Sequence, residues 1–502
     1  MTTDPPDIVD RLAGAAGRYR DALPTGRLLA FPVTAIDRLG IPTWSVTFDA
    51  ADGSTGGGHG YGETDEEALT GALGELSEVT HGAAAFRRIE RRRASYRSLV
   101  VEVGAGGATD PLTLGLPAGS DVDGETELEW VPARRWTTGE TVWVPADVAA
   151  SLGEDLAGYH PFTTPITNGL GAGDSVARAL GHGLLELAQR DGNGLSFRAL
   201  DRGVELDVSS ASPANQALLD LLMAAGVEAV PKLASIGDDA FGLANVYVVG
   251  RDLADDGDPL MATACGEAAD TDRDRALRKA ILEFAAARAR KAFTHGPLDV
   301  VAAITPNGYL DDYLDRHRSD LEEPRALDAM VSWLELDNAE MTALLDDTVL
   351  ARRATVAFED LPASPDAGVQ HRTDGVLLAL AAQGLDVLLV DLSPPGADDS
   401  GDHGVHVVKA IVPGMEVETM SYHRIGERGA ARLLARDSHL VGRGAPPRAG
   451  TAPIRLTATA TERLGGPVWL DVAEIDRIVG RLYPLYREPG RHRAALASRA
   501  RF

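Results

Sequence analysis

The amino-acid sequence predicts an α+β protein in which mixed sheets pack against helices, organised as a single large body with a small C-terminal extension. Strand-like and helix-like patterns mix without a strict strand–helix–strand rhythm, which indicates a compact α+β or mixed α/β body. The chain has 502 residues, 44% of them hydrophobic, so it can bury a large core and is neither disordered nor fibrous. A segment rich in Gly, Pro and Ala at 442–451 separates the body from the C-terminal piece.

The elements follow from the spacing of apolar residues. Short apolar runs predict strands at 28–34, 44–48, 99–103, 142–145, 246–249, 387–391 and 405–412. Apolar residues at helical spacing predict helices at 64–80, 174–190, 215–225, 270–290, 327–344 and 374–382. Segments rich in Gly and Asp predict surface loops at 104–126 and 396–403. We therefore expect an N-terminal segment at 1–26, a main domain at 27–440 and an Arg-rich extension at 441–502.

The charge balance is strongly acidic. The chain has 75 Asp and Glu against 48 Lys and Arg, for a formal net charge of −27. Only four of the cationic residues are lysines: Lys232, Lys279, Lys291 and Lys409. An acidic surface that keeps Arg and nearly lacks Lys predicts a halophilic protein, because carboxylates hold water and cations at high salt. Self-repulsion at this charge also argues against nucleic-acid binding over the whole surface.

The remaining composition predicts a cytoplasmic protein without a membrane segment. One cysteine, Cys265, excludes disulfides and cysteine-rich metal sites and is most simply a small core residue. The acidic N-terminus has no apolar stretch of a secretion signal. The densest apolar run, at 376–390, is interrupted by polar residues and is too short to span a bilayer.

One internal repeat points to chemistry. Three predicted helices share the pattern Ala-x3-(Ala or Gly)-x2-Glu: Ala68, Ala72, Glu75; Ala179, Gly183, Glu186; Ala276, Ala280, Glu283. Glycines precede each helix: Gly60 and Gly62; Gly169, Gly171 and Gly173; Gly266. The residues expected to cap the three helix starts are Asp65, Asp174, and Thr271 or Asp272.

The repeat places a carboxylate on a tightly packed helix face. Positions i, i+4 and i+7 share one face, so each Glu lies on the same stripe as two small residues. For a single helix, a solvated Glu is the commoner situation. Three inward carboxylates would instead require cations, and Mg²⁺ favours sites that combine carboxylates with substrate phosphates. The sequence thus predicts a polycarboxylate Mg²⁺ site for a nucleoside triphosphate, with Glu78 as a further ligand and Arg190 on a phosphate.

Known nucleotide motifs do not account for this site. No Gly-x4-Gly-Lys-(Ser/Thr) loop occurs, which excludes a P-loop. The glycines at 169–173 lack the spacing of a dinucleotide loop and are more typical of a tight turn that opens a helix N-terminus toward an anion.

An ordered set of motifs occupies the stretches 35–44, 60–62, 68–78, 167–191, 276–288 and 407–416, within about residues 27–435. This set resembles the YcaO family, the ATP-dependent enzymes that activate backbone amides. The resemblance implies a YcaO-like fold, ATP and Mg²⁺ as cofactors, and a homodimer. It assigns Mg²⁺ to Glu75, Glu78, Glu186 and Glu283, and the nucleotide to these four with Asp174, Gln189, Arg190 and Lys279.

Several positions depart from the family pattern. Gly71 replaces a usual Ser, Val79 an Arg, Tyr61 a Lys, Asp174 an Asn, Gln189 a Glu and Lys279 an Arg. Asp174 and Gln189 still offer oxygen ligands, whereas Lys279 keeps the charge without the bidentate fork of Arg. These departures bear on turnover more than on fold.

The resemblance implies that ATP phosphorylates an amide oxygen of a peptide or protein, after which a nucleophile attacks the carbon. The chain ends at 498–502 without the proline-rich tail of azoline-forming members, which favours a thioamide product and a TfuA-like partner protein. The alternative is a nucleotide-binding accessory or scaffold protein without turnover, such as a ribosomal-protein methylthiotransferase accessory factor. A third interpretation is sulfur transfer onto tRNA.

Two Arg-rich stretches allow two interpretations. One contains Arg87, Arg88, Arg91, Arg92, Arg93 and Arg97, and the other spans 477–501 with seven arginines and Glu488. Such runs usually pair with carboxylates on solvated faces, and the alternative is docking of an acidic protein or RNA. His81 and His182 lie near the Glu helices and receive no role.

Overall fold

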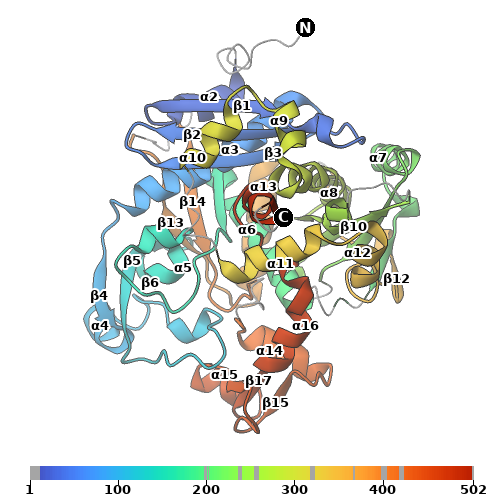
Figure 1. The fold of residues 1–502 in the computed structure, drawn as a ribbon. Coiled ribbons are helices and arrows are strands. Elements are labelled where there is room, and N and C mark those ends of the chain that lie inside the picture. The colour runs from blue at the N-terminus through green and yellow to red at the C-terminus, as the bar shows by residue number, and fades with distance from the viewer. Residues whose placement is uncertain are drawn as a thin grey trace.

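A computed structural model describes residues 12–196, 201, 203–235, 240–253, 259–316, 323–365, 368–396, 404–417 and 423–499. It confirms the predicted α+β class, because several mixed sheets pack against helices (Figure 1).

The first sheet forms the top layer of the molecule in Figure 1. It is antiparallel in the order β1-β2-β3, with β1 at Gly26–Pro32, β2 at Thr43–Ala50 and β3 at Thr55–Tyr61. Helix α3 (Asp65–Phe86) packs on it together with α2 (Gly14–Ala22) around a cluster of buried residues that includes Trp44 and Leu73. Strand β3 is the last strand of this sheet, which leaves one of its edges without a partner strand among the described residues.

Two larger sheets form the centre. The six-stranded sheet has the order β4-β5-β13-β14-β7, with β6 paired to β5: β4 Arg92–Ser95, β5 Glu127–Arg135, β6 Thr141–Pro145, β7 Leu170–Gly173, β13 Leu388–Asp391 and β14 His406–Ile411. The five-stranded sheet has the order β11-β10-β9-β8-β12: β8 Val204–Asp207, β9 Val227–Leu233, β10 Ala244–Asp252, β11 Gly266–Asp270 and β12 Ala354–Ala357. Only β12 and β8 pair in parallel among the described strands.

A small sheet near the C-terminus has the order β15-β17-β16, with β15 at Val441–Arg443, β16 at Thr451–Pro453 and β17 at Val468–Asp471. The remaining helices are α4 Tyr96–Val103, α5 Ala146–Ala149, α6 Val176–Ser196, α7 Pro213–Ala224, α8 Arg273–His295, α9 Leu298–Ile304, α10 Tyr309–Arg316, α11 Pro324–Leu334, α12 Asn338–Leu345, α13 Val369–Ala382, α14 Glu427–Ala435, α15 Ala458–Arg463, α16 Val472–Val479 and α17 Arg493–Arg499.

Most predicted elements are confirmed within a few residues, and two are wrong. The run at 99–103 is helix α4, because Ser95 caps it by accepting a hydrogen bond from the Ser98 N–H. Leu99 is buried on one face of this helix, whereas Val101 is 84% exposed. The predicted helix at 327–344 is two helices, since Asp337 caps α12 after α11 has ended.

The predicted surface loop at 104–126 is also wrong in part. Leu114, Leu116 and Val122 within it are buried, so the segment packs onto the body. Of the loop predicted at 396–403, all but Gly396 lies outside the described residues. The C-terminal region shares a hydrophobic cluster with the body, in which Leu470 and Tyr483 pack with Trp333. The domain boundaries remain a prediction.

Among the described helices, none has both the length and the apolar character that crossing a bilayer requires.

Candidate functional site

The sequence repeat corresponds to a strand–helix unit that occurs three times: β3 with α3, β7 with α6, and β11 with α8. In each unit a strand glycine touches the helix backbone. A Cβ on Gly60 would lie 2.0 Å from the Ala68 carbonyl oxygen, and one on Gly171 would lie 2.2 Å from that of Ala179. In the third unit, a Cβ on Gly266 would lie 2.0 Å from a carbonyl oxygen of α8. The strand glycines and the small helix residues therefore allow the helix and the strand to pack in direct backbone contact.

The repeated Glu of each unit points back at its own strand. Glu75 accepts a hydrogen bond from the His59 N–H at 2.7 Å. Glu186 accepts one from the Gly169 N–H at 3.0 Å, just before β7. Glu283 accepts one from the N–H of residue 267 at 3.1 Å. The packed stripe thus directs all three carboxylates inward, along the strands, rather than to the outer surface.

Two contacts join the first unit to the other two. The Glu78 carboxylate on α3 accepts a hydrogen bond from the Ala172 N–H of β7 at 2.9 Å. The Tyr61 hydroxyl at the end of β3 donates to Glu283 of α8 at 3.3 Å. These contacts bring the three units around one interior region.

Glu267 on β11 joins the second unit to the third, and no sequence pattern predicted it. Only 4% of it is exposed, and its carboxylate accepts hydrogen bonds from Gln189 at 3.0 Å, from Arg190 at 3.3 Å and from Asn193. The Cys265 thiol donates to its other oxygen at 3.4 Å. Gln189 therefore uses its amide N–H toward a carboxylate, and Cys265 is a half-buried residue beside the site. No repeat marks Glu267, so its place could be found only from the fold.

Burial and mutual repulsion shift the carboxyl groups of this region. Burial raises the pKa of Glu75, and nearby Glu186 raises it further. Burial followed by Glu186 and Glu75 raises the pKa of Glu78 well above its usual range. Burial and Glu267 raise the pKa of Glu283 to about 7. Such shifts mark acidic groups that are close together in a region that lacks enough positive charge.

Four cationic side chains lie around these carboxylates. The Arg190 guanidinium lies 3.6 Å from the carboxylate of Glu186, which is one helical turn earlier on α6. Lys279 is exposed and lowers the pKa of Glu283 only slightly against the larger effect of burial. Lys409 is buried on β14, where burial lowers its pKa to about 8 against the opposing effect of Glu186. The fourth, Arg290, is described below.

Asp174 directly follows β7, whose Ala172 N–H binds Glu78, and forms ion pairs of its own. Its carboxylate pairs with Arg18 at 3.3 Å and with Arg178 at 2.9 Å. It lies on the side of Tyr19, whose pKa is raised to about 12 by burial first and then by Glu78 and Asp174.

The C-terminal segment returns to this region through Glu488 and Arg491. Glu488 accepts hydrogen bonds from Arg290 of α8 at 2.9 and 3.2 Å and lies 2.7 Å from the Lys291 ammonium. Burial raises the pKa of Glu488, but Arg290 and Lys291 hold it well below its usual range. The pKa of Arg290 is raised by Glu488 and also by Glu75 and Glu283. Arg290 therefore lies between the C-terminal segment and the candidate site.

A cavity of about 350 Å³ opens beside Glu75. It is lined by Thr47, Thr55, Gly56, Gly57, Gly58, His59, Glu75, Val79, Tyr313 and Arg491. Glu75 is surrounded by protein but its side chain is exposed to this cavity. Arg491 from the C-terminal segment contacts the His59 ring at 2.8 Å.

The donor set fits a cation that a bound nucleotide completes. Within the described part of the chain, no three His, Cys, Asp or Glu side chains form a ready-made metal site. Glu75, Glu78 and Glu283 each hold one oxygen on a backbone N–H, and the structure gives the other oxygen no hydrogen bond. Mg²⁺ commonly takes one or two carboxylates and fills its other positions with phosphate oxygens and water.

Two of the three predicted helix caps are wrong. Thr64, not Asp65, caps α3 through the Glu67 N–H. At the start of α6, the side chain of Ser175, not Asp174, accepts a hydrogen bond from the backbone, donated by the Arg178 N–H at 3.3 Å.

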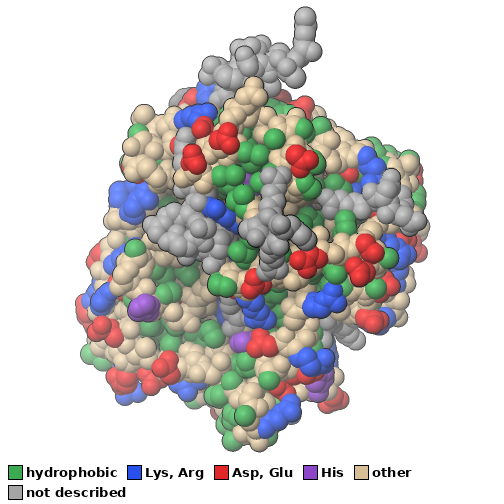
Figure 2. Space-filling view, in the orientation of Figure 1, with side chains coloured by type: hydrophobic (Ala, Val, Ile, Leu, Met, Phe, Trp, Pro, Cys, Tyr) green, Lys and Arg blue, Asp and Glu red, His purple; other side chains and the backbone are tan. Residues whose placement is uncertain are grey.

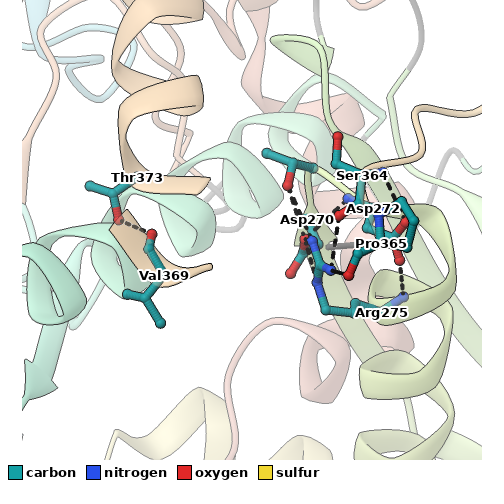
Figure 3. A network of polar contacts seen from close by, with 8 residues as sticks. Asp270, Asp272, Arg275, Ser364, Pro365, Val369 and Thr373 are labelled. Carbon is teal, nitrogen blue, oxygen red and sulfur yellow. Dashed lines mark hydrogen bonds and ion pairs between the residues drawn. The ribbon is translucent and has the colours of Figure 1, made fainter. Parts of the chain in front are cut away.

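The third cap is confirmed and belongs to a polar network, shown in Figure 3. Asp272 accepts a hydrogen bond from the Arg275 N–H at 3.0 Å and another from the Ser364 N–H at 2.9 Å. The Arg275 guanidinium binds Asp270 at 2.9 Å and the Pro365 carbonyl at 2.9 Å. This network fixes the start of α8, the helix that carries Lys279 and Glu283.

The first Arg-rich stretch pairs with acidic residues, as the first interpretation expects. Arg91 and Arg93 bind Glu129 at 3.3 and 2.9 Å, and Arg92 pairs with Glu102. Figure 2 shows blue and red side chains mixed over the visible face. In the second stretch, Arg477 pairs with Glu474, and Arg501 lies outside the described residues. RNA docking remains a prediction.

The two histidines differ. His81 is buried, and burial lowers its pKa to about 4. The His182 ring nitrogen lies 3.9 Å from the Glu78 carboxylate. Desolvation by the surrounding protein lowers the pKa of His182 to about 4, and the positive charge of Lys279 contributes to this shift. His182, which received no role from the sequence, therefore lies beside Glu78 in its neutral form.

A protein-family model described as "YcaO cyclodehydratase, ATP-ad Mg2+-binding" matches residues 59–416. The chain is 30% identical over 411 residues to an uncharacterized protein of Methanothermobacter thermautotrophicus, covering 79% of this chain and 91% of that protein.

Two solved structures have a similar fold. A heterocyclase in complex with substrate and cofactor gives a TM-score of 0.59 at 19% identity, covering 84% of this chain and 54% of that chain. The chain thus spans about half of that heterocyclase. The YcaO protein of Methanopyrus kandleri bound with AMPPCP and Mg²⁺ gives a TM-score of 0.55 at 21% identity, covering 82% and 91%.

Proposed function

The chain belongs to the YcaO family, and from this we propose that it uses ATP and Mg²⁺ to phosphorylate a backbone amide of a peptide or protein. The observation that carries the proposal is the convergence of three strand–helix units whose inward carboxylates have raised pKa values and stand among Arg190, Lys279 and Lys409. Acidic groups in this state are stabilised by a divalent cation.

We assign Mg²⁺ to Glu75, Glu78, Glu186 and Glu283. Their backbone hydrogen bonds fix the direction of each carboxylate before any cation arrives. We assign the phosphates to Arg190 and Lys279, whose charges suit a developing phosphoryl transition state. Gln189 acts through Glu267, and Asp174 takes part only when its pairs with Arg18 and Arg178 open.

Bound ATP would supply the phosphoryl group and Mg²⁺ its charge neutralisation. The amide oxygen attacks the γ-phosphorus and ADP leaves. A hydrosulfide donor then attacks the activated carbon, and phosphate leaves with the former amide oxygen, which yields a thioamide. The residues named above position the amide and the phosphates, because phosphoryl transfer asks little covalent chemistry of the protein.

We propose a thioamide as the product of this reaction. A TfuA-like partner, a homodimer and a high-salt cytoplasm remain part of the proposal. The heterocyclase of similar fold was solved in complex with its substrate.

The second candidate is a nucleotide-binding accessory protein without turnover. The specific observation is that Gln189, at a position where the family has Glu, donates to Glu267. An amide there adds no negative charge for a second cation. Under this alternative the site binds Mg²⁺ and ATP but does not transfer phosphate.

A proteomic comparison tests the main proposal. Peptides from cells with the native chain should contain a backbone amide in which sulfur replaces oxygen, and cells with Glu186→Gln should lack it. If the two sets of peptides are identical and the purified native chain binds ATP without hydrolysing it in the presence of its partners, the accessory function stands instead. If the native chain does not bind Mg²⁺ and ATP, both candidates fail.

A further inference from the structure

We propose that the free edge of β3 binds the substrate peptide as an added strand and leads its backbone to Glu75. The inference rests on the proposed function, since it takes the substrate to be a peptide backbone. Its ligand class is an extended peptide recognised mainly through main-chain hydrogen bonds.

The pairing of β3 with β2 shows which backbone groups point outward. The Ala50 N–H donates to the Ser54 carbonyl at 2.9 Å, and the Gly62 N–H donates to the Pro42 carbonyl at 3.3 Å. In an antiparallel pair the hydrogen-bonded positions alternate, so the even-numbered residues of β3 face β2. The N–H and C=O groups of Thr55, Gly57 and His59 therefore face away from the sheet.

One outward group already has a partner, which confirms this direction. The His59 N–H donates to Glu75 at 2.7 Å. The structure gives the outward N–H groups of Thr55 and Gly57 no partner. A row of such groups is a template for an additional strand.

The edge faces open space. Five consecutive residues of β3, from Thr55 to His59, line the cavity of about 350 Å³ beside Glu75. Gly56 and Gly58 are glycines because helix α3 leaves no room, with a Cβ on Gly58 only 2.5 Å from the Ala72 carbonyl oxygen. Gly57 faces the other side, where a Cβ would lie 3.2 Å from the Val46 carbonyl oxygen and 3.7 Å from Arg491. A bare backbone at Gly57 keeps the edge accessible.

The edge ends at the candidate site. A peptide paired with β3 would run past Thr55 and Gly57 and meet Glu75 where the His59 N–H is already taken. At this point strand pairing would stop, and an unpaired peptide amide would lie next to the carboxylates assigned to Mg²⁺. Strand pairing fixes an amide without reading its side chain, so the edge accepts a range of sequences, with Tyr313 and Arg491 across the cavity.

A matched pair of variants at Gly57 tests the proposal. Gly57→Pro removes the outward N–H, and Gly57→Ala adds a Cβ but keeps that N–H. Neither change touches a hydrogen bond to β2, because residue 57 faces the free edge. The probe is a fluorescent random-sequence library of peptides about ten residues long, which exceeds the length of β3. Its binding is followed by anisotropy in the presence of Mg²⁺ and an ATP analogue that is not hydrolysed.

We expect the Pro variant to bind the library about tenfold more weakly than the Ala variant. The Pro variant lacks the backbone N–H at residue 57 that would donate to the peptide, and its ring occupies the strand edge at that position. The native chain should also discriminate against a fully N-methylated library, which covers the case that Gly57→Pro does not fold. Equal binding of Pro and Ala variants, or equal binding of methylated and unmethylated peptides, overturns the inference. If the native chain binds the Mg²⁺-bound analogue but not the library, the edge inference fails and the proposed function stands. If it does not bind the analogue, the proposed function itself fails.

Discussion

Single acidic residues set the chemistry of this protein. Glu75, Glu78 and Glu283 are each oriented by a backbone N–H and destabilised as anions by burial and by other carboxylates. An unpaired buried charge is costly, so Glu283, whose pKa is raised to about 7, is partly protonated near neutral pH in the ion-free protein. A divalent cation has to displace that proton, which links its binding to pH.

Glu283 makes this linkage measurable. Its pKa is about 7, so in the ion-free protein it is protonated below that pH and ionised above it. We expect the affinity for Mg²⁺ and ATP to fall about tenfold for each pH unit below 7, because one proton must leave for each cation bound. Calorimetric titrations between pH 5.5 and 8.5 measure this dependence.

The control for this titration is Glu283→Gln, which cannot ionise. Its affinity should be weaker at pH 8 and less dependent on pH. A native affinity that does not change across the range would contradict the assignment of Glu283 as a ligand.

The strand–helix unit is the structural element that makes the site possible. Glycine on the strand and Ala or Gly on the helix allow contact so close that the next helical turn places Glu beside the strand's own N–H. Three copies, at β3, β7 and β11, supply three carboxylates from distant parts of the chain.

Two glycines of the first unit should respond to alanine in opposite directions. Gly60→Ala forces a Cβ to within 2.0 Å of the Ala68 carbonyl oxygen and should lower the free energy of unfolding by about 3 kcal/mol. Gly71→Ala lies in α3, where the nearest atom to its Cβ is at 3.5 Å, and should raise that energy by up to about 1 kcal/mol. Urea denaturation of both variants measures the difference. Equal effects of the two changes would refute the close-packing account.

At the level of elements, the sequence predicts those features whose residues recur at a regular spacing. It located α3, α6 and α8 and the Ala-Glu stripe, because small residues and carboxylates recur at helical spacing. It missed β3 and β7, since their glycine-rich sequences resemble turns, and β11, since its short sequence has no run of large apolar residues. It joined α11 and α12 because their apolar spacing continues across Asp337, whose capping role depends on the side chain.

The site as a whole depends on the path of the complete chain. The three Glu residues and Arg190 were predictable from repeat and motif, whereas Glu267 lies in no repeat. The 407–416 motif and the Arg-rich stretch at 477–501 contain Lys409 and Arg491 but do not place them beside the carboxylates. Their positions follow from sheet order and from the return of the C-terminal segment. Asp174, predicted from its motif position, pairs with Arg18, and its role in nucleotide binding remains a prediction.

The C-terminal segment should stabilise the whole molecule through Glu488. Glu488→Ala leaves the buried Lys291 and its neighbour Arg290 without their shared carboxylate. We expect the free energy of unfolding to fall by about 3–5 kcal/mol, as for other broken buried ion pairs. Freed Arg290 should also compete with Mg²⁺ for Glu75, so nucleotide affinity should fall. Glu462→Ala, at an exposed position, is the control. A Glu488→Ala variant with unchanged stability and nucleotide affinity would show that the C-terminal segment neither stabilises the fold nor affects the site.

The acidic surface predicts a salt requirement for the whole molecule. With a net charge of −27, added KCl should screen self-repulsion and raise Tm at neutral pH. Near the pI of about 4.8 the effect should shrink, because the repulsion disappears. Thermal unfolding in a KCl series at both pH values measures this, and a Tm that does not rise at neutral pH would argue against a high-salt protein.

The most direct test of the account compares Glu75→Gln with Glu66→Gln, since both lie on α3 and Glu66 is exposed in its first turn. The measurement is the affinity for ATP with and without Mg²⁺. The account predicts that Glu75→Gln weakens Mg²⁺-dependent binding at least about tenfold with an unchanged fold, while Glu66→Gln behaves as the native chain. Equal Mg²⁺-dependent affinities in both variants would contradict a cation site built from the inward carboxylates.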